Sequence, residues 1–164
     1  MRRKNFLTLL LLSAALLSSC RSAFQPPPES FERWRKEDTS VQQVMAALLE
    51  CGYPWPGSSV GDWEKAYGAT WESSLILAKR CVEKQGFVEK YNNGSAAECK
   101  YYSSEQTKKY QTEEQNRAIA KACHPDTPPT EPSVERRLNS PYCKTEWARK
   151  YPQCQPVVVP SVKK

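Results

Sequence analysis

The cysteines constrain the fold of this chain more than any other feature. The sequence contains seven of them: six between residues 51 and 154, and one, Cys20, apart from the others near the N-terminus. The six are even in number, they include no C-x-x-C pair, and the chain has a single histidine, which together disfavour a metal site or free thiols. In an oxidising compartment this pattern predicts three disulfides. They would be formed by Cys51, Cys81, Cys99, Cys123, Cys143 and Cys154.

The N-terminal segment has the layout of a secretory signal peptide. Residues 1–5 carry three basic side chains and no acidic one, and residues 6–17 are apolar except for Thr8 and Ser13. A basic head followed by about 7–15 apolar residues is typical of such signals, whereas a membrane-spanning helix needs roughly 20. We therefore expect residues 1–19 to be removed on export to a compartment where disulfides form.

The segment Leu17-Ser18-Ser19-Cys20 resembles the lipobox of bacterial lipoproteins, in which an aliphatic residue and two small residues precede a cysteine. In that class the cysteine is acylated on its sulfur, commonly with palmitate, and the signal is cut before it. The resemblance implies that Cys20 is the lipid attachment site and that this lipid anchor holds the chain at a membrane. In Gram-negative lipoproteins an Asp after the cysteine typically retains the protein at the inner membrane, so Arg21 implies the outer membrane. The alternative is an ordinary signal peptide followed by a chance cysteine.

The charge of the mature chain argues against a nucleic-acid partner. Removing residues 1–19 leaves 164 − 19 = 145 residues, and basic residues fall from 24 to 21 against 18 acidic ones, so the net charge falls from +6 to +3. No stretch concentrates Lys and Arg as a nucleic-acid patch does. We expect an envelope protein or a cell-wall polymer as partner, and a length of this order suits one domain with a modest core.

The composition divides the mature chain into three parts. Residues 20–30 carry the anchor and a tether with three consecutive prolines, which favour the extended polyproline II conformation. Residues 31–154 are predicted to form a disulfide-rich α-helical domain, and residues 155–164 a flexible tail. Because strand-like runs are few, the expected fold class is mainly α, a small disulfide-stapled helical domain with long loops.

Two amphipathic helices are predicted in the first half of the domain. The first is capped by Thr39 or Ser40 and ends before Gly52, and a second runs from Thr70, as cap, to about Gln85. A short helical turn is expected over residues 62–67. The first helix would bury Val41, Val44, Met45, Leu48 and Leu49, and the second Trp71, Leu75, Ala78, Cys81 and Val82.

The second half of the domain is more polar. A long, mostly solvated helix is expected over residues 103–123, with Ala118, Ile119 and Ala122 as its apolar stripe and Pro125 at its end. Residues 127–132 form a linker rich in proline and threonine. A last short helix is expected to begin at Ser140-Pro141, because proline is favoured at the first helical position, and to run to about residue 150.

The predicted helices suggest one disulfide directly. Cys51 lies at the end of the first helix and Cys81 on the apolar face of the second, so packing the two faces would bring the cysteines together. We therefore predict a Cys51–Cys81 bond. The later four would pair among themselves, as Cys99–Cys123 and Cys143–Cys154 for instance, although the sequence leaves other pairings open.

Little in the sequence predicts catalysis. His124 is flanked by Cys123 and Asp126, but a catalytic Cys-His pair needs two side chains that point at each other, which neighbours in a chain rarely do. The sequence contains no nucleophile elbow, no metal-spaced histidines and no phosphate-binding loop. We therefore expect a non-enzymatic protein without a cofactor or metal.

The loop Tyr53-Pro54-Trp55-Pro56 is the best candidate for a binding site. Stiff aromatic residues in a loop often contact partners, so Tyr53 and Trp55 are possible partner-binding residues. The interpretation that we favour is that both fold over the first helix and complete the core beside Cys51.

Residues 31–87 resemble a set of small uncharacterised lipoproteins of Gram-negative bacteria and their prophages. The shared segments are Phe31-Glu32-Arg33-Trp34, the stretch AALLECGYP at residues 46–54 and CVEKQGF at residues 81–87. The resemblance supports the architecture and implies no activity. The favoured function is a membrane-anchored lipoprotein that binds a protein or cell-wall partner. The alternatives are an inhibitor or immunity protein directed at lysozyme or a toxin, and a phage lysis or exclusion lipoprotein.

Overall fold

The computed structural model describes residues 29–91 and 94–157. Helices dominate these residues, which confirms the predicted mainly α, disulfide-stapled fold. The predicted signal, Cys20 and the three tether prolines lie outside the described part. None of the helices in that part is long and apolar enough to cross a membrane.

The domain begins with helix α2 (Ser30–Arg33) and strand β1 (Trp34–Arg35). Strand β1 pairs antiparallel with β2 (Val88–Glu89), so that Trp34 stands opposite Glu89. This short ribbon brings the start of the domain against the segment that follows its second main helix.

Helix α3 (Val41–Glu50) forms as predicted and is capped by Ser40. The Ser40 hydroxyl accepts from the Gln43 amide at 3.3 Å, and the Gln43 side chain accepts from the Ser40 amide at 2.9 Å. Gly52 follows with a φ of +103°, a left-handed conformation that suits glycine at a helix end. The predicted buried face needs one correction, because Val41 is exposed and Ala46 and Ala47 are buried instead.

Helix α4 (Val60–Tyr67) and the 3-10 turn η2 (Gly68–Thr70) lead into α5 (Trp71–Lys84). The predicted Thr70 cap is wrong in detail, since its side chain makes no capping bond to α5 and its carbonyl accepts from the Ser73 hydroxyl at 2.8 Å. Helix α5 buries Ala78, Cys81 and Val82 as predicted.

The prediction of one long helix over residues 103–123 is wrong. The chain instead forms α6 (Gly94–Tyr102), α7 (Glu105–Lys108) and α8 (Glu113–Cys123). A side-chain cap explains the break before α8, since Thr112 accepts from the Gln115 amide at 3.2 Å. Before α7 the break coincides with the extended conformation of Ser104, whose side chain makes no capping bond. Ile119 and Ala122 are buried as expected.

The C-terminal part also differs from prediction. A helix not foreseen, α9 (Val134–Leu138), is capped by Ser133, and the predicted helix over residues 140–150 is a series of turns that ends in the 3-10 turn η3 (Pro152–Cys154). Residues 155–157, predicted as the start of the tail, belong to the described part. The remainder of that predicted tail lies outside it.

The three predicted disulfides are present, and the pairing is the one expected. Cα–Cα distances are 5.6 Å for Cys51–Cys81, 5.6 Å for Cys99–Cys123 and 5.3 Å for Cys143–Cys154. Each bond lies in or against a different cluster of buried apolar side chains. Among the described residues, each bond therefore reinforces a separate cluster of buried apolar side chains.

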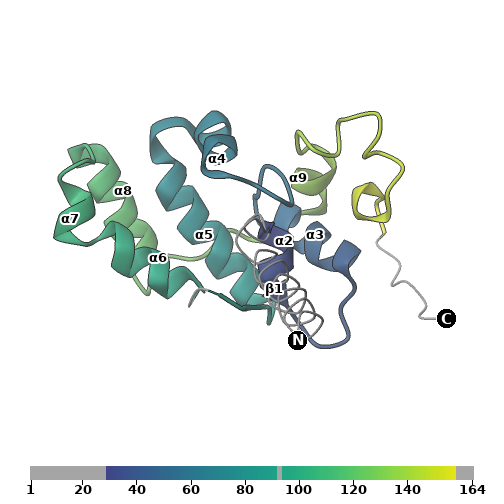
Figure 1. Cartoon of the computed structure of the whole chain (residues 1–164), viewed down its shortest axis with the longest axis horizontal. Coiled ribbons are helices and arrows are strands. Elements are labelled where there is room, and N and C mark those ends of the chain that lie inside the picture. Colours follow the sequence, from purple (N-terminus) through teal and green to yellow (C-terminus); the bar gives the residue numbers. More distant parts are fainter. Residues whose placement is uncertain (1–28, 92–93, 158–164) are drawn as a thin grey trace, which may run out of the picture.

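Figure 1 shows how these clusters are distributed. Helices α6, α7 and α8 lie at one end of an elongated molecule, the segment after α9 lies at the other, and α5 runs between α8 and the central pair of α2 and α3. Gly52, at the end of α3, also accepts from the Tyr67 hydroxyl at 2.5 Å, which fixes α4 against the centre.

Candidate functional site

The two aromatic residues of the predicted binding loop have different positions. Tyr53 is 3% exposed and packs edge-on against Trp63 with ring centroids 5.0 Å apart, so it is part of the core. Trp55 is half-buried and packs edge-on against Tyr142 at 5.6 Å. The Phe31 amide donates to the Pro56 carbonyl at 3.0 Å, which ties this loop to α2. Of the two candidates, Trp55 therefore stays available to a partner.

Trp55 lines a cleft of about 520 Å³, which we name the aromatic cleft. Its walls come from α2, α3, the loop after Tyr53 and the turns after α9. Ring contacts continue from Tyr142 to Trp147 at 5.3 Å and from Trp147 to Tyr151 at 6.1 Å, each edge-on. The apolar lining consists of Phe31, Met45, Trp55, Tyr142 and Trp147.

Two carboxylates add a negative edge to the aromatic cleft. Glu29 and Asp62 both line it, and Asp62 is held by the Ser59 amide and hydroxyl, each donating at 2.8 Å. Gly57 leaves room for Glu29, because a Cβ at this position would collide with the Glu29 carboxylate. An apolar floor with carboxylates at its edge suits an apolar side chain flanked by basic groups.

Trp147 is the residue of this site that sequence reasoning missed. It is 51% exposed although its ring packs edge-on against Tyr142. Its position in a predicted helix gave no sign of this exposure. The signal that could have suggested it is that Trp147 and Tyr151 lie within the 11-residue loop that the Cys143–Cys154 disulfide closes, where a continuous helix need not form.

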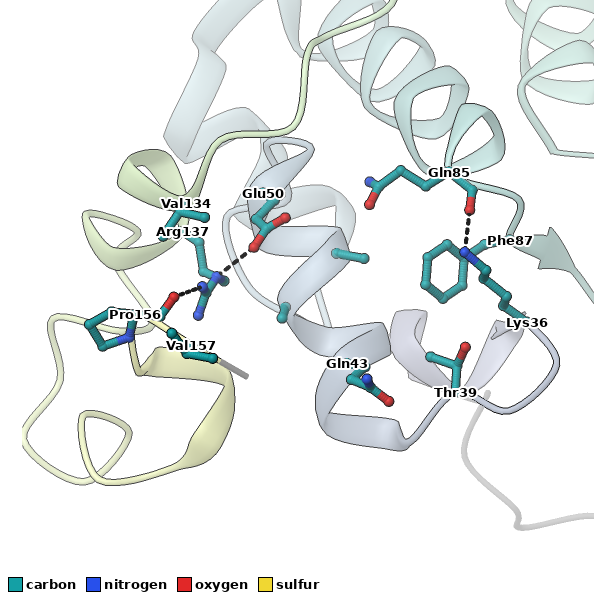
Figure 2. Close-up of a pocket in the computed structure, with 12 residues that line it drawn as sticks. Lys36, Thr39, Gln43, Glu50, Gln85, Phe87, Val134, Arg137, Pro156 and Val157 are labelled. Carbon is teal, nitrogen blue, oxygen red and sulfur yellow. Dashed lines mark hydrogen bonds and ion pairs between the residues drawn. The ribbon is translucent and has the colours of Figure 1, made fainter. Parts of the chain in front are cut away.

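A second pocket of about 420 Å³ lies on the other side of α3, and Figure 2 shows its lining. Lys36 donates to the Gln85 carbonyl at 2.8 Å on one side, and Arg137 pairs with Glu50 at 2.8 Å on the other. The charged groups drawn there are thus already engaged in hydrogen bonds or ion pairs with other residues of the protein. We assign this pocket a structural role, in which Arg137 fastens the C-terminal segment to α3.

The residues considered for catalysis do not form a reactive pair. Cys123 is bonded to Cys99, so it supplies no thiolate. His124 is exposed and accepts from the Asp126 amide at its Nδ1 atom at 3.3 Å. Among residues 29–91 and 94–157, no three His, Cys, Asp or Glu side chains group as ligands for a metal ion.

Burial alters the acid–base behaviour of several side chains. It raises the pKa of Tyr53 and of Tyr102, and the nearby carboxylate of Glu98 raises both further. Burial likewise raises the pKa of the Glu72 carboxyl. The two phenols therefore stay protonated at neutral pH.

Comparison with known proteins adds no family to this picture. No family model matches the chain, and no curated protein or solved structure matches it significantly. Evidence about function therefore comes from the cavities, the exposed aromatic residues and the N-terminal sequence.

Proposed function

We propose that this chain is a lipid-anchored lipoprotein of the bacterial outer membrane whose helical domain binds an envelope protein through the aromatic cleft. The observation that supports the binding part is Trp147, which is half exposed although its ring packs edge-on against Tyr142 with centroids 5.3 Å apart. Rigid aromatic side chains in a partly preformed pocket are typical anchors of protein interfaces. The anchoring part is supported by the signal-like residues 1–19 and by the lipobox that ends in Cys20.

The lining of the cleft indicates what the partner presents. Trp55, Tyr142 and Met45 offer an apolar floor to one large apolar side chain, and Met adapts its shape readily. Glu29 and Asp62 favour a Lys or Arg beside it. The partner segment we propose is therefore a surface loop or helix with an apolar residue next to basic ones.

The function that we propose is binding and not catalysis. Its single histidine is exposed beside Asp126, and the adjacent Cys123 is held in a disulfide. A cell-wall polymer is the second candidate partner, because an exposed indole such as that of Trp147 also stacks against the C–H face of a sugar ring. The experiment below separates the two.

A photo-crosslinking amino acid in place of Trp147 tests the proposal in growing cells. We expect an adduct with one envelope protein, because position 147 lies at the rim of the aromatic cleft. The matched control places the same amino acid at Tyr110, which is 81% exposed and belongs to the α7–α8 connection at the far end of the molecule. The control should give no such adduct.

Two outcomes would contradict the protein-partner proposal. One is an adduct that forms equally from positions 147 and 110, since this would reflect random collision. The other is an adduct that a wall-degrading hydrolase reduces to the size of the free chain, which would make the wall polymer the partner. Glu29→Gln should lower the adduct yield, whereas Glu113→Gln on exposed α8 should leave it unchanged.

A further inference from the structure

A smaller and more enclosed cavity of about 210 Å³ adjoins the aromatic cleft. The two share a wall: Glu29 and Phe31 line the cleft, whereas Ser30 and Arg33 from the same turn line the smaller cavity. Its other walls come from the loop before α4 and from α4, α5, β2 and α6. We name it the polar cavity.

Three buried charged side chains lie at the polar cavity. The Lys79 ammonium on α5 binds Glu89 on β2 at 2.9 Å and Glu98 on α6 at 2.6 Å. Their side chains are 6%, 2% and 14% exposed respectively. Burying such a group costs desolvation energy that apolar side chains of similar size would avoid. This cost suggests that the charges have a use beyond packing.

The charges around the polar cavity are balanced. Arg33 also lines it, so two cationic side chains accompany the two carboxylates of Glu89 and Glu98. A balanced lining gives no net attraction to an ion of either sign. It does offer fixed hydrogen-bond donors and acceptors close together, which suits a neutral ligand that can both donate and accept.

The hydroxyl of Tyr53 is the second observation that points to a ligand. Tyr53 is 3% exposed and lines the cavity, yet its hydroxyl has no hydrogen-bond partner among the residues that the structure describes. Burial and then the carboxylate of Glu89 raise the pKa of Tyr53, whereas the Trp34 indole, which can only donate to the phenol oxygen, lowers it by less. The hydroxyl therefore stays protonated, and a buried donor without a partner destabilises the fold unless a ligand accepts from it.

We propose that the polar cavity binds the ring of a neutral pyranose sugar. Sugar hydroxyls both donate and accept, so one ring can accept from Tyr53 and donate to Glu89 or Glu98. Trp34 and Trp63 also line the cavity, so the C–H groups of the ring would meet apolar aromatic atoms there. The cavity is smaller than the roughly 300–1,000 Å³ of pockets for drug-sized ligands, so it suits a single ring. This inference goes beyond the proposed function, because it concerns a different cavity.

Saturation-transfer NMR on the purified full chain tests the inference with two probes, methyl glucoside and N-acetylglucosamine. We expect transfer to the ring protons of at least one sugar at millimolar concentration. Tyr53→Phe should weaken the binding of that sugar about tenfold, which is the effect of losing one hydrogen bond. Tyr110→Phe, which removes an exposed hydroxyl far from the cavity, is the matched control and should leave binding unchanged.

The variants distinguish lost binding from lost structure. Tyr53→Phe removes a buried hydroxyl without a partner, so the protein should be as stable as before or more so. Val60→Trp places a large ring at an exposed position of the cavity wall and should block binding while leaving the core intact. Two results would overturn the inference: no transfer to either sugar, or equal binding by wild type, Tyr53→Phe and Val60→Trp. Neither result would change the outcome expected for cross-linking from position 147, so the proposed function is tested separately.

Discussion

Replacing Arg137 with methionine perturbs the fastening of the C-terminal segment to α3. Arg137 is 1% exposed, and its Nε atom donates to a Glu50 carboxylate oxygen at 2.8 Å. One Nη1 bond goes to the Gln153 carbonyl at 2.8 Å and another to the Gln155 carbonyl at 2.6 Å, and Nη2 donates to the Pro156 carbonyl at 3.3 Å. A single side chain therefore satisfies four acceptors.

The expected loss follows from these contacts. Removing one partner of a buried ion pair costs about 3–5 kcal/mol, and an unmet buried carbonyl about 1–3 kcal/mol. Glu50 is partly exposed and Gln155 is exposed, so water can replace part of the loss. We therefore expect Arg137→Met to lower the free energy of unfolding by about 3–4 kcal/mol, a large share of the roughly 5–15 kcal/mol of a typical domain.

Urea denaturation followed by circular dichroism measures this loss directly. Arg117→Met, a matched change at an exposed position of α8, should alter the free energy of unfolding by less than about 0.5 kcal/mol. Amide exchange should also show faster exchange of residues 153–155 in the Arg137 variant. A loss below about 1 kcal/mol would refute the view that Arg137 holds this segment in place.

Three further predictions follow from the disulfides, the buried carboxylate and the proposed anchor. Replacing Cys51 and Cys81 together with alanine opens a loop of 30 residues and should lower the free energy of unfolding by about 3–4 kcal/mol in denaturation experiments; a loss below 1 kcal/mol would contradict this. Because burial raises the pKa of Glu72 above its ordinary 4.5, the folded state binds this proton more tightly than the unfolded chain, so stability should fall as the pH rises through and above 4.5. Glu72→Gln should remove that fall, and urea titrations at pH 3 and pH 7 that show the same pH dependence in both proteins would refute it. Cys20→Ala should release the protein from membrane fractions and prevent cleavage after Ser19, and a variant that matures normally and stays with the membranes would contradict the lipoprotein proposal.

The first half of the domain could be predicted well because its signals are local. The spacing of Val44, Leu48 and Leu49 and the Ser40–Gln43 cap define α3 without reference to the rest of the chain. The Cys51–Cys81 bond followed from the same reasoning, since both cysteines lie on faces that the apolar pattern identifies.

The structure of the second half could not be predicted in this way because it depends on contacts between residues that are distant in the sequence. Helix α9 carries no apolar stripe of its own, and Arg137 is buried there because Glu50 and the carbonyls after residue 152 satisfy it. The run of polar residues from 103 to 123 predicts one solvated helix, but the Thr112 cap starts a new helix, α8, within it.

The aromatic cleft and the polar cavity differ in how well the sequence alone could identify their residues. Trp55 was identifiable as a stiff aromatic in a proline loop, whereas its neighbour Tyr53 carried the same signal and is buried. Nothing in the sequence joins Lys79 to Glu89 and Glu98, because α5, β2 and α6 must first pack for the three to meet.

Intact-mass and peptide analysis of protein extracted from bacterial membranes under thiol-blocking conditions tests the central claim most directly. The account predicts a chain that begins at Cys20, carries acyl groups on that residue, and contains no alkylated cysteine among the six that form disulfides. A chain that begins at Met1 without lipid, or one in which two or more of those six cysteines are alkylated, would contradict an exported, lipid-anchored and disulfide-stapled protein.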